Sequence, residues 1–295
     1  MTNETATGDS SEPAWGLTRD QLATIPTVYA PDLFENHTFL ISGGGSGMGL
    51  GTAFLAARLG GNVMICGRDA EKLKHAADDI KRLVGREIAW KSLTIRDPDQ
   101  VNALMDECFE RFGHVDTLVN SAGGQFAQHA LDMTVKGWNA VIDTNLNGSF
   151  WMMQAAGRRW RDRGTFGSIV TIVATIDRGS PHYAHSAAAR AGIVYLTKTL
   201  AVEWAPLRIR VNCIAPGNTA IEGRFDKYSP DYRNRFTQGN PMRTAGDVWD
   251  MAQAVAYLSG PSGKFVTGEV LNVNGGMHLW GTNWPLGMPD HFKLG

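Results

Sequence analysis

Three glycines near the start of the chain have a spacing that suits the binding of a phosphate-bearing ligand. Gly43, Gly47 and Gly49 follow the apolar run 39–42 in the pattern G-x-x-x-G-x-G and open a helix-like stretch. Such a turn needs positive φ, brings backbone close to a pyrophosphate, and offers free N–H groups at the helix N-terminus. The segment therefore predicts a nicotinamide dinucleotide site. Its expected contacts in this turn are Ser42, Gly43, Ser46, Gly47, Met48 and Gly49.

The end of the second predicted strand selects the form of this cofactor. A carboxylate about 20 residues beyond the glycine turn would hold a ribose 2′-hydroxyl and favour NAD. The run Asn62–Cys66 is instead followed by Gly67 and Arg68, with no carboxylate at its tip. A guanidinium can pair with a 2′-phosphate, which a carboxylate would repel. Arg68 therefore favours NADP(H), over the alternative that it is a surface residue at the start of the next helix.

Short apolar runs alternate with longer amphipathic stretches from Thr38 onward. The predicted strands are Thr38–Ser42, Asn62–Cys66, Ile88–Leu93, Thr117–Asn120, Ser168–Ala174, Arg210–Ile214 and Glu269–Val273. The predicted helices include Ala70–Leu83, Pro98–Phe112, Ala184–Trp204 and Val248–Leu258. Several strands are apolar throughout, as expected where helices cover both faces of a sheet. The order predicts an α/β fold of Rossmann type, a doubly wound parallel sheet in a single domain with a lid insertion after the sixth strand.

The chain divides into one large domain and two flanking segments. Residues 1–30 are expected to be a disordered or loosely packed extension, since their first half is polar and lacks periodicity. The Rossmann-type domain is expected over residues 31–277, including a lid at 218–246 in which five basic and three acidic residues are interleaved with aromatic ones. A lid that grips a ligand and a solvated helix with one buried face both fit this composition. Residues 278–295 are expected to pack on the domain or on a neighbouring subunit.

Bulk composition excludes several classes of function. The 295 residues are 43% hydrophobic and 19% charged with a net charge of −1, which leaves no overall positive charge for binding nucleic acid or a membrane surface. Three scattered cysteines, Cys66, Cys108 and Cys213, fit neither a disulfide framework nor a zinc site, so no metal is expected. No apolar run is long enough to span a bilayer, the first residues lack signal-peptide features, and the C-terminal glycine does not fit the peroxisomal pattern. We therefore expect a cytoplasmic protein without membrane insertion.

Four motifs make the sequence similar to the short-chain dehydrogenase/reductase family over residues 32–277. They are the turn 42–49, the run 120–123 (Asn-Ser-Ala-Gly), Asn145 within Asp-Thr-Asn-Leu-Asn-Gly, and Pro216-Gly217. The resemblance implies a homo-oligomer, either a dimer or a tetramer, and further cofactor contacts after the later strands. These implied contacts are Asn120, Ala122, Gly123, Arg190, Pro216, Gly217 and Thr219.

The catalytic serine of that family and its Tyr-x-x-x-Lys pair are missing from this chain. Alignment on the run 196–200 places Ser186 at the tyrosine position and Arg190 at the lysine position, while the serine position falls at or near Ala174, next to Thr175. Ser186 and Arg190 are four residues apart and so share one face of a helix. Serine is a much weaker acid than a tyrosine whose pKa a lysine lowers, and arginine stays protonated. Reduction of a ketone, which needs a positioned acid, is therefore disfavoured.

A hydroxyl donor beside a fixed cation suits a different reduction. Hydride addition to the β-carbon of an α,β-unsaturated thioester develops negative charge on the thioester oxygen, which such a pair can stabilise. The chain resembles the peroxisomal trans-2-enoyl-CoA reductase branch of the family in residues 123–126, 136–138, 144–146, 184–192, 200–204 and 210–217. This resemblance implies an acyl-CoA substrate reduced by NADPH, with hydride delivered to C3 and a proton to C2. The alternatives are a 2,4-dienoyl-CoA reductase, another activated-alkene or carbonyl reductase, and a non-catalytic NADP(H)-binding subunit or sensor.

Four residues are the candidates for catalysis. Arg190 is expected to hydrogen-bond the nicotinamide ribose and supply positive charge, with a helix-surface position as the alternative. Ser186 is expected to donate to the thioester oxygen, with packing in an alanine-rich helix as the alternative. Asn145 matches the family's helix asparagine, which holds a water near the site, against a cap or turn role. Tyr183, like His185, is a candidate proton donor, although loop packing accounts for either residue more simply.

A cluster of arginines precedes the fifth predicted strand. Arg158, Arg159, Arg161 and Arg163 would suit the phosphates of coenzyme A by charge. They come directly before a strand, however, and ligands of such sheets bind at the carboxyl ends of the strands. A solvated or subunit-contact role is therefore favoured over CoA binding.

Overall fold

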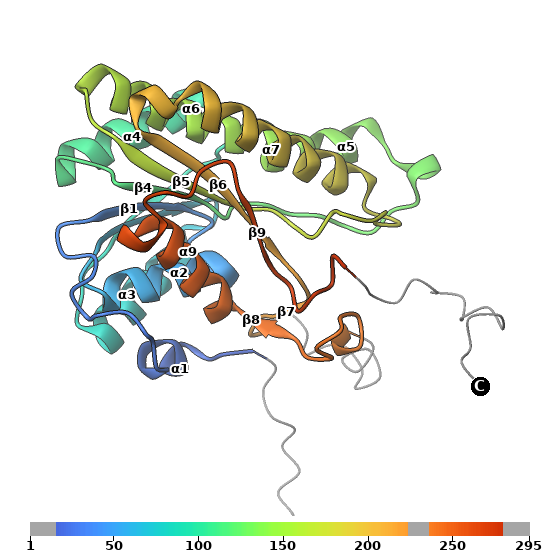
Figure 1. Cartoon of the computed structure of the whole chain (residues 1–295), viewed down its shortest axis with the longest axis horizontal. Coiled ribbons are helices and arrows are strands. Elements are labelled where there is room, and N and C mark those ends of the chain that lie inside the picture. The colour runs from blue at the N-terminus through green and yellow to red at the C-terminus, as the bar shows by residue number, and fades with distance from the viewer. Residues whose placement is uncertain (1–15, 224–235, 280–295) are drawn as a thin grey trace, which may run out of the picture.

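A parallel sheet of seven strands forms the centre of the molecule in the computed structural model, which describes residues 16–223 and 236–279 (Figure 1). The strands are β1 (Thr38–Ser42), β2 (Asn62–Gly67), β3 (Ala89–Ser92), β4 (Thr117–Asn120), β5 (Gly167–Ile172), β6 (Ile209–Pro216) and β9 (Val270–Val273). They lie in the order β3-β2-β1-β4-β5-β6-β9, and every neighbouring pair is parallel. The predicted Rossmann-type sheet in a single domain is confirmed, with strand ends that move by one or two residues.

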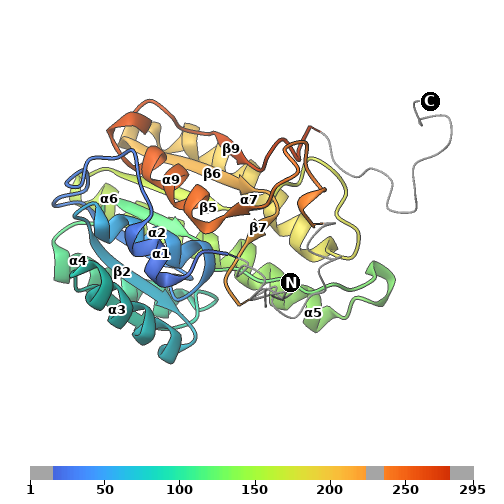
Figure 2. The same ribbon diagram turned by 90° about the horizontal axis from the view of Figure 1, so that it is seen from below.

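Helices cover both faces of the sheet (Figures 1 and 2). Below it in Figure 1 lie α1 (Arg19–Thr24), α2 (Gly47–Arg58), α3 (Ala70–Val84) and α9 (Val248–Ser259). Above it lie α4 (Pro98–Phe112), α5 (Val135–Ile142), α6 (Ser149–Arg163) and α7 (Ala184–Glu203). An apolar core fills each interface, with Phe54 on one side and Trp160 on the other, which explains why the strands are apolar on both faces. None of the helices in the described ranges is long and apolar enough to cross a membrane.

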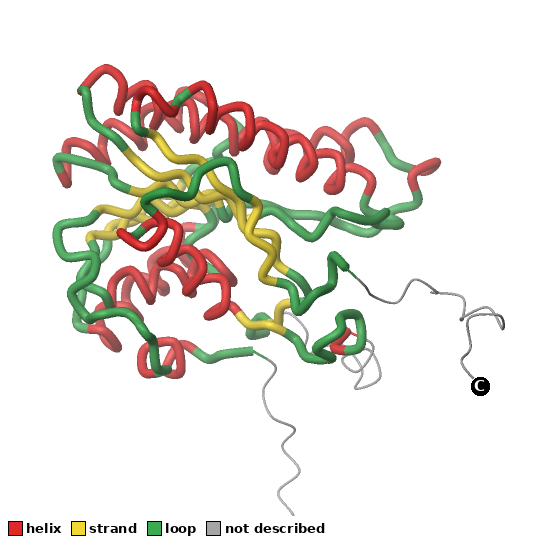
Figure 3. Tube along the Cα trace, in the orientation of Figure 1, coloured by secondary structure: helices red, strands yellow, loops and turns green. Residues whose placement is uncertain are grey.

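The chain connections reverse direction at β1 and β4, the two strands at the middle of the sheet. α2 follows β1 on one face, whereas the segment after β4 leads to α5 on the other (Figure 3 shows the strands in yellow between the helical layers). Ser42 and Asn120, the last residues of these strands, are register partners. Ligands of open α/β sheets bind outside the carboxyl ends of the strands at such a point of reversal. This topology therefore locates the site before any side chain is considered.

Residues 16–30 pack closely on the domain, so the prediction of a disordered or loosely packed extension is wrong for this part. Leu22 of α1 is buried, and Arg58 of α2 donates hydrogen bonds to the carbonyl oxygens of Leu22 (3.0 Å) and Ile25 (2.8 Å). The Tyr29 hydroxyl donates to the carbonyl oxygen of Gln253 in α9 (2.9 Å). α1 has six residues, too few for an apolar period to show in the sequence. Residues 1–15 of the predicted extension lie outside the described residues.

Only the two ends of the predicted lid 218–246 belong to the described part of the chain. β7 (Thr219–Ala220) pairs with β8 (Gly246–Asp247), so the segment leaves and re-enters the domain at one place. The residues between them at 224–235, which carry most of the basic and aromatic side chains, are outside the described residues, as are residues 280–295 of the tail. The lid and the packing of the tail therefore stay predictions.

Candidate active site and cofactor site

The turn after β1 forms a cradle, and its first residue, Gly43, has no side chain that could fill it. Gly43 has a φ of +72°, and its N–H donates to the carbonyl oxygen of Cys66 (2.8 Å). A Cβ at this position would lie 2.7 Å from the backbone nitrogen of Ala122, which only glycine avoids. α2 begins at Gly47, and the preceding Ser46 makes no side-chain capping bond to the first N–H groups of the helix. The cradle and the uncapped helix start fit the pyrophosphate of a dinucleotide.

The predicted contacts after β4 lie beside this cradle. Asn120 is buried, and its Nδ2 is within 3.4 Å of the Ser149 carbonyl oxygen and 3.5 Å of Thr171 Oγ1, so it braces β4 against α6 and β5. The Ala122 N–H donates to Ser42 Oγ (3.3 Å), which joins the end of β4 to the end of β1. This arrangement supports a bracing role for Asn120 next to the cofactor rather than a catalytic one.

The turn after β6 closes the opposite side of the crevice. The Gly217 N–H donates to the carbonyl oxygen of Val273 in β9 (3.1 Å), and the Thr219 hydroxyl donates back to the Gly217 carbonyl (3.1 Å). The hydroxyl of Thr175 donates to the carbonyl oxygen of Pro216 (3.0 Å) and accepts from Nδ2 of Asn274 (2.9 Å). Thr175 is therefore committed to holding this turn, and it does not replace the serine that the family places at the preceding position.

Ser186 and Arg190 lie one turn apart on α7 and point into the same region. The Ser186 hydroxyl donates to Oε1 of Gln125 (2.8 Å), and Nη1 of Arg190 donates to the carbonyl oxygen of Ile172 at the end of β5 (2.9 Å). The Arg190 guanidinium also lies directly against Gly123, close enough to exclude a side chain there. Burial lowers the pKa of Arg190 to about 10, so the residue remains a cation at neutral pH.

Asn145 fixes the loop that passes between these residues. It is fully buried in a π-helical stretch (Asp143–Gly148) that joins α5 to α6 without a break. Its Oδ1 accepts from the N–H of Gly124 (3.0 Å) and its Nδ2 donates to the carbonyl oxygen of the same residue (2.9 Å). π-helical turns inside helices are frequent at functional sites. Both ends of the Asn145 amide thus hold the Gly123–Gly124 backbone near Arg190.

The start of α7 presents two candidates for the proton donor. Tyr183 occupies the N-cap position and is half-buried. His185 is fully buried, with Nδ1 2.7 Å from the Ser186 N–H and its ring edge-on to Phe126 at 4.6 Å between centroids. Since Nδ1 accepts, the proton of the neutral ring lies on Nε2, which has no hydrogen-bond partner among the described residues. The two residues occupy different environments, and only Tyr183 has partial exposure.

Sequence reasoning overlooked a second arginine at the end of the sheet. Arg96 and Arg68 line one pocket of about 180 Å³ together with Phe126 and the backbone at 123–125. The Arg96 side chain is held by hydrogen bonds to Thr144 Oγ1 (2.6 Å) and the Ala140 carbonyl oxygen (2.7 Å). The signal was available, because Arg96 follows the third strand as Arg68 follows the second, and carboxyl ends of parallel strands share one edge.

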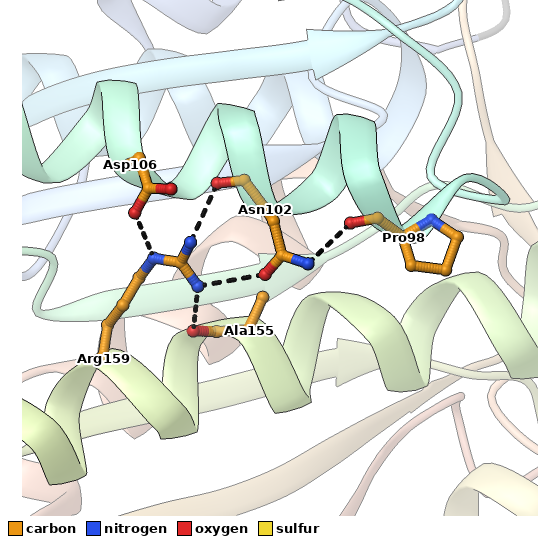
Figure 4. A network of polar contacts seen from close by, with 5 residues as sticks. All are labelled: Pro98, Asn102, Asp106, Ala155 and Arg159. Carbon is orange, nitrogen blue, oxygen red and sulfur yellow. Dashed lines mark hydrogen bonds and ion pairs between the residues drawn. The ribbon is translucent and has the colours of Figure 1, made fainter.

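The four arginines of α6 lie at the other end of the sheet, as predicted from their position before β5. Arg159 joins α6 to α4: its Nε donates to Asp106 (2.7 Å), and its other nitrogens donate to Asn102 and to the Ala155 carbonyl oxygen (Figure 4). Arg163 stacks over Phe109 of α4, with its guanidinium carbon 4.6 Å from the ring centroid. These contacts within the chain account for two of the four residues.

Replacement of Arg159 should lower stability without touching the site. We expect Arg159→Met to reduce the free energy of unfolding by about 1–2 kcal/mol, because the backbone and side-chain acceptors of α4 lose their donor. Arg161→Met is the matched control, since Arg161 is largely exposed and pairs with its neighbour Asp162, and it should change stability by less than about 0.5 kcal/mol. Denaturant unfolding of both variants measures the difference, and equal stabilities would show that the Arg159 contacts contribute nothing net.

A doubly wound parallel sheet with a glycine cradle after β1 and a buried cation at the carboxyl ends of the strands is typical of the dinucleotide-binding class of proteins. Residues 43–278 match the model of the family described as enoyl-(acyl carrier protein) reductase. A probable 2,4-dienoyl-CoA reductase of Bacillus subtilis is 35% identical over 83% of this chain and 98% of its own length. A 3-oxoacyl-[acyl-carrier-protein] reductase of Chlamydia muridarum is 35% identical over 83% of this chain and 98% of its own length.

A solved structure gives the same result at the level of the fold. The citronellol catabolism dehydrogenase of Pseudomonas aeruginosa is 32% identical and superposes with a TM-score of 0.76, over 85% of this chain and 99% of that one. The protein therefore belongs to the short-chain dehydrogenase/reductase family, as the sequence motifs predicted, and is an NAD(P)-dependent oxidoreductase.

Proposed function

We propose that the protein uses NADPH to reduce the C2=C3 double bond of a trans-2-enoyl-CoA. The observation that carries this proposal is the pair of Ser186 and Arg190 on one face of α7, where the family has tyrosine and lysine. A serine hydroxyl is too weak an acid to protonate an alkoxide efficiently, whereas a hydroxyl and a fixed cation can both stabilise an enolate oxygen. The geometry therefore favours a conjugated thioester over a ketone as substrate.

The residues present fit a nicotinamide cofactor. Its pyrophosphate would lie on the Gly43–Gly49 turn, its nicotinamide end against Arg190, Gly217 and Thr219, and a 2′-phosphate against Arg68. When bound, the reduced cofactor supplies the hydride that reaches C3. Arg190 orients the ribose and keeps positive charge beside the developing enolate, because its guanidinium stays protonated.

Gln125 is a third member of the catalytic set. In the structure its Oε1 accepts the Ser186 hydroxyl, but the oxygen and nitrogen of a glutamine amide are assigned from the hydrogen-bond network. With the amide reversed, Gln125 donates to Ser186 Oγ and leaves the Ser186 proton directed at the thioester oxygen. Either Gln125 or Ser186 then donates to the enolate. Tyr183, half-buried at the start of the same helix, is the proposed source of the proton that reaches C2, and His185 is the second candidate.

The pocket of Arg68, Arg96 and Phe126 supports a coenzyme A carrier. It offers two cations and an aromatic side chain beside the loop that carries Gln125. A phosphate group of the carrier would pair with the Arg96 guanidinium, next to the Arg68 assigned to the 2′-phosphate, and the ring would contact the apolar part of the carrier. Two adjacent residues connect this pocket to Ser186. Gln125 accepts a hydrogen bond from the Ser186 hydroxyl, and the Phe126 ring packs on His185.

Loss of Arg96 should therefore weaken binding of the carrier and spare the chemistry. We expect Arg96→Met to raise the KM for an enoyl-CoA by about tenfold with kcat within about twofold of wild type, because the lost contact acts equally in the ground and transition states. The same acyl group on N-acetylcysteamine, which carries no phosphate, is the control substrate and should show no difference between the proteins. An equal loss with both thioesters would indicate a structural role for Arg96 through Thr144 and Ala140 instead.

One assay tests the proposed reaction. NADPH oxidation is followed by absorbance with 2-enoyl-CoA, 2,4-dienoyl-CoA and 3-oxoacyl-CoA substrates of matched chain length. The enoyl substrates should turn over with the highest kcat/KM. Efficient turnover of 3-oxoacyl substrates without turnover of enoyl substrates would overturn the proposal, and tight NADPH binding without turnover of any substrate would indicate a sensor.

A 2,4-dienoyl-CoA reductase is the second candidate. It is favoured by the Bacillus subtilis relative, which is named a probable 2,4-dienoyl-CoA reductase. Hydride addition at C5 of a dienoyl thioester, instead of at C3 of an enoyl thioester, distinguishes the two reactions, and the product formed from a dienoyl substrate separates them.

We also propose that the protein is a homo-oligomer. β9 forms one edge of the sheet, and the nearby Phe265 is completely exposed, while Tyr195 and Val202 lie largely exposed on α7. Apolar side chains grouped on a sheet edge and on one helix are typical of subunit contacts.

A further inference from the structure

The N-terminal segment reaches the cofactor cradle from outside the sheet. α1 lies beside α2 (Figures 1 and 2), and a pocket of about 90 Å³ opens between the two. Leu17 and Arg19 line this pocket from the N-terminal segment, and Gly45, Ser46 and Gly47 line it from the glycine turn. Arg19 thus brings a positive charge to the wall of the turn where α2 begins.

The guanidinium of Arg19 is held in place by a carboxylate that serves two cations. Arg19 forms an ion pair with Asp79 of α3, and Arg82 approaches the same carboxylate at 2.8 Å. The Arg19 side chain is 34% exposed and the Asp79 side chain 18%, so the pair lies at the boundary of the solvent. Asp79 carries one negative charge, and Arg19 and Arg82 each carry one positive charge. The three residues together therefore keep a net positive charge that can attract an anion at the turn.

The segment is also fixed to the far side of the crevice. Gly16 has a φ of +103°, and a Cβ on it would lie 2.6 Å from the backbone nitrogen of Glu222, just after β7. The chain 16–19 therefore spans from the residues that follow β6 to the glycine turn that follows β1. Glu222 is exposed and lines the same pocket, so its carboxylate adds a negative charge that Arg19 offsets.

We propose that Arg19 is a cofactor-binding residue, whose guanidinium attracts the pyrophosphate held at the N-terminus of α2. The uncapped helix start and the positive side chain act on the same anion from two directions. The proposal rests on the proposed cofactor site but needs neither the enoyl-CoA reaction nor the choice of NADPH. The 2′-phosphate is assigned to Arg68 in a different pocket, so Arg19 acts on the group that NADPH and NADH share.

Cofactor binding without turnover tests this role. Dissociation constants for NADPH and NADH are measured by fluorescence titration for the wild type, Arg19→Met, Arg19→Lys and Arg82→Met, with thermal unfolding to confirm that each variant is folded. Arg19→Met should weaken both nucleotides by the same factor of about three to ten, and Arg19→Lys should stay within about twofold of wild type. Arg82→Met is the matched control, since Arg82 pairs with the same Asp79 but lies outside the lining of the pocket, and should bind both nucleotides normally.

Three results would overturn the role of Arg19. They are unchanged binding in Arg19→Met, equal losses in Arg19→Met and Arg82→Met, and a loss confined to NADPH. The outcome is separable from the proposed function, because a protein that fails to reduce enoyl-CoA still yields these dissociation constants. A wild type that binds NADH as tightly as NADPH would contradict the proposed cofactor preference and leave the Arg19 comparison intact.

Discussion

Arg190→Met should reduce kcat/KM for an enoyl-CoA by about 10²- to 10³-fold, the range expected when a preorganised charge is removed from a developing oxyanion. It should also raise the dissociation constant for NADPH by about tenfold, since we propose that the guanidinium binds the nicotinamide ribose. Methionine keeps an unbranched apolar stem and removes the guanidinium, which is the part of Arg190 that lies against Gly123. Steady-state kinetics and fluorescence titration measure the two effects separately.

Arg190→Lys is the control for this substitution. It restores the residue that the family usually has and keeps the positive charge, although it loses the planar donor that now reaches the Ile172 carbonyl oxygen. We expect it to recover most of the activity, within about tenfold of wild type. If Arg190→Met showed wild-type kinetics while remaining folded, Arg190 would have no part in the mechanism. Ser186 and Gln125 would then be the only proposed residues that stabilise the enolate.

The fold was predictable because its signals are local. A buried parallel strand is apolar throughout and ends at a turn rich in glycine, and both features are visible within a few residues at Thr38–Gly49. The strand–helix alternation then fixes the topology, and the topology fixes which ends of the strands share an edge. The same reasoning correctly removed the arginines of α6 from the site, since their distance from it follows from chain order alone.

The side chains that complete the site were less predictable, because they depend on contacts between distant segments. Gln125 and Phe126 belong to a loop whose path is fixed by Asn145, about 20 residues later, and no local pattern shows that Ser186 would meet Gln125. The packing of residues 16–30 was missed for a similar reason, since its stabilising partners lie in α2 and α9. Chain order therefore predicts at which edge of the sheet the candidate site lies, whereas its inner hydrogen bonds are visible only in the structure.

The net charge of the chain does not show that several cations lie in one region of the molecule. Arg19, Arg68, Arg96 and Arg190 all lie at the carboxyl edge of the sheet, in or beside the crevice. Cations grouped in a cleft can concentrate anions locally, even where the net charge is −1. Arg68 and Arg96 share one pocket, whereas Arg19 lines another and Arg190 lies on α7, so removal of each arginine tests a different proposed contact.

Arg68→Asp should reverse the preference of the protein between its two possible cofactors. Loss of the cation proposed to bind the 2′-phosphate, together with repulsion by the new carboxylate, should lower the ratio of NADPH to NADH affinity by about 10²- to 10³-fold. The carboxylate can also accept hydrogen bonds from the ribose hydroxyls of NADH, so the affinity for NADH should rise rather than stay constant. Both dissociation constants are measured without acyl substrate, because Arg68 also lines the proposed carrier pocket.

Two control variants isolate the origin of this effect. Arg68→Met removes the cation without adding a carboxylate and should give an intermediate ratio, whereas Arg96→Met removes the other cation of the same pocket and should leave the ratio unchanged. If both arginines shifted the ratio equally, the pocket would act only as a region of positive potential, and Arg68 would lose its specific assignment to the 2′-phosphate. If neither shifted it, the preference for NADPH inferred from the end of β2 would be wrong. A shift confined to Arg68 would instead show that one side chain at the tip of β2 selects the nucleotide, while the glycine turn and Arg19 bind what the two nucleotides have in common.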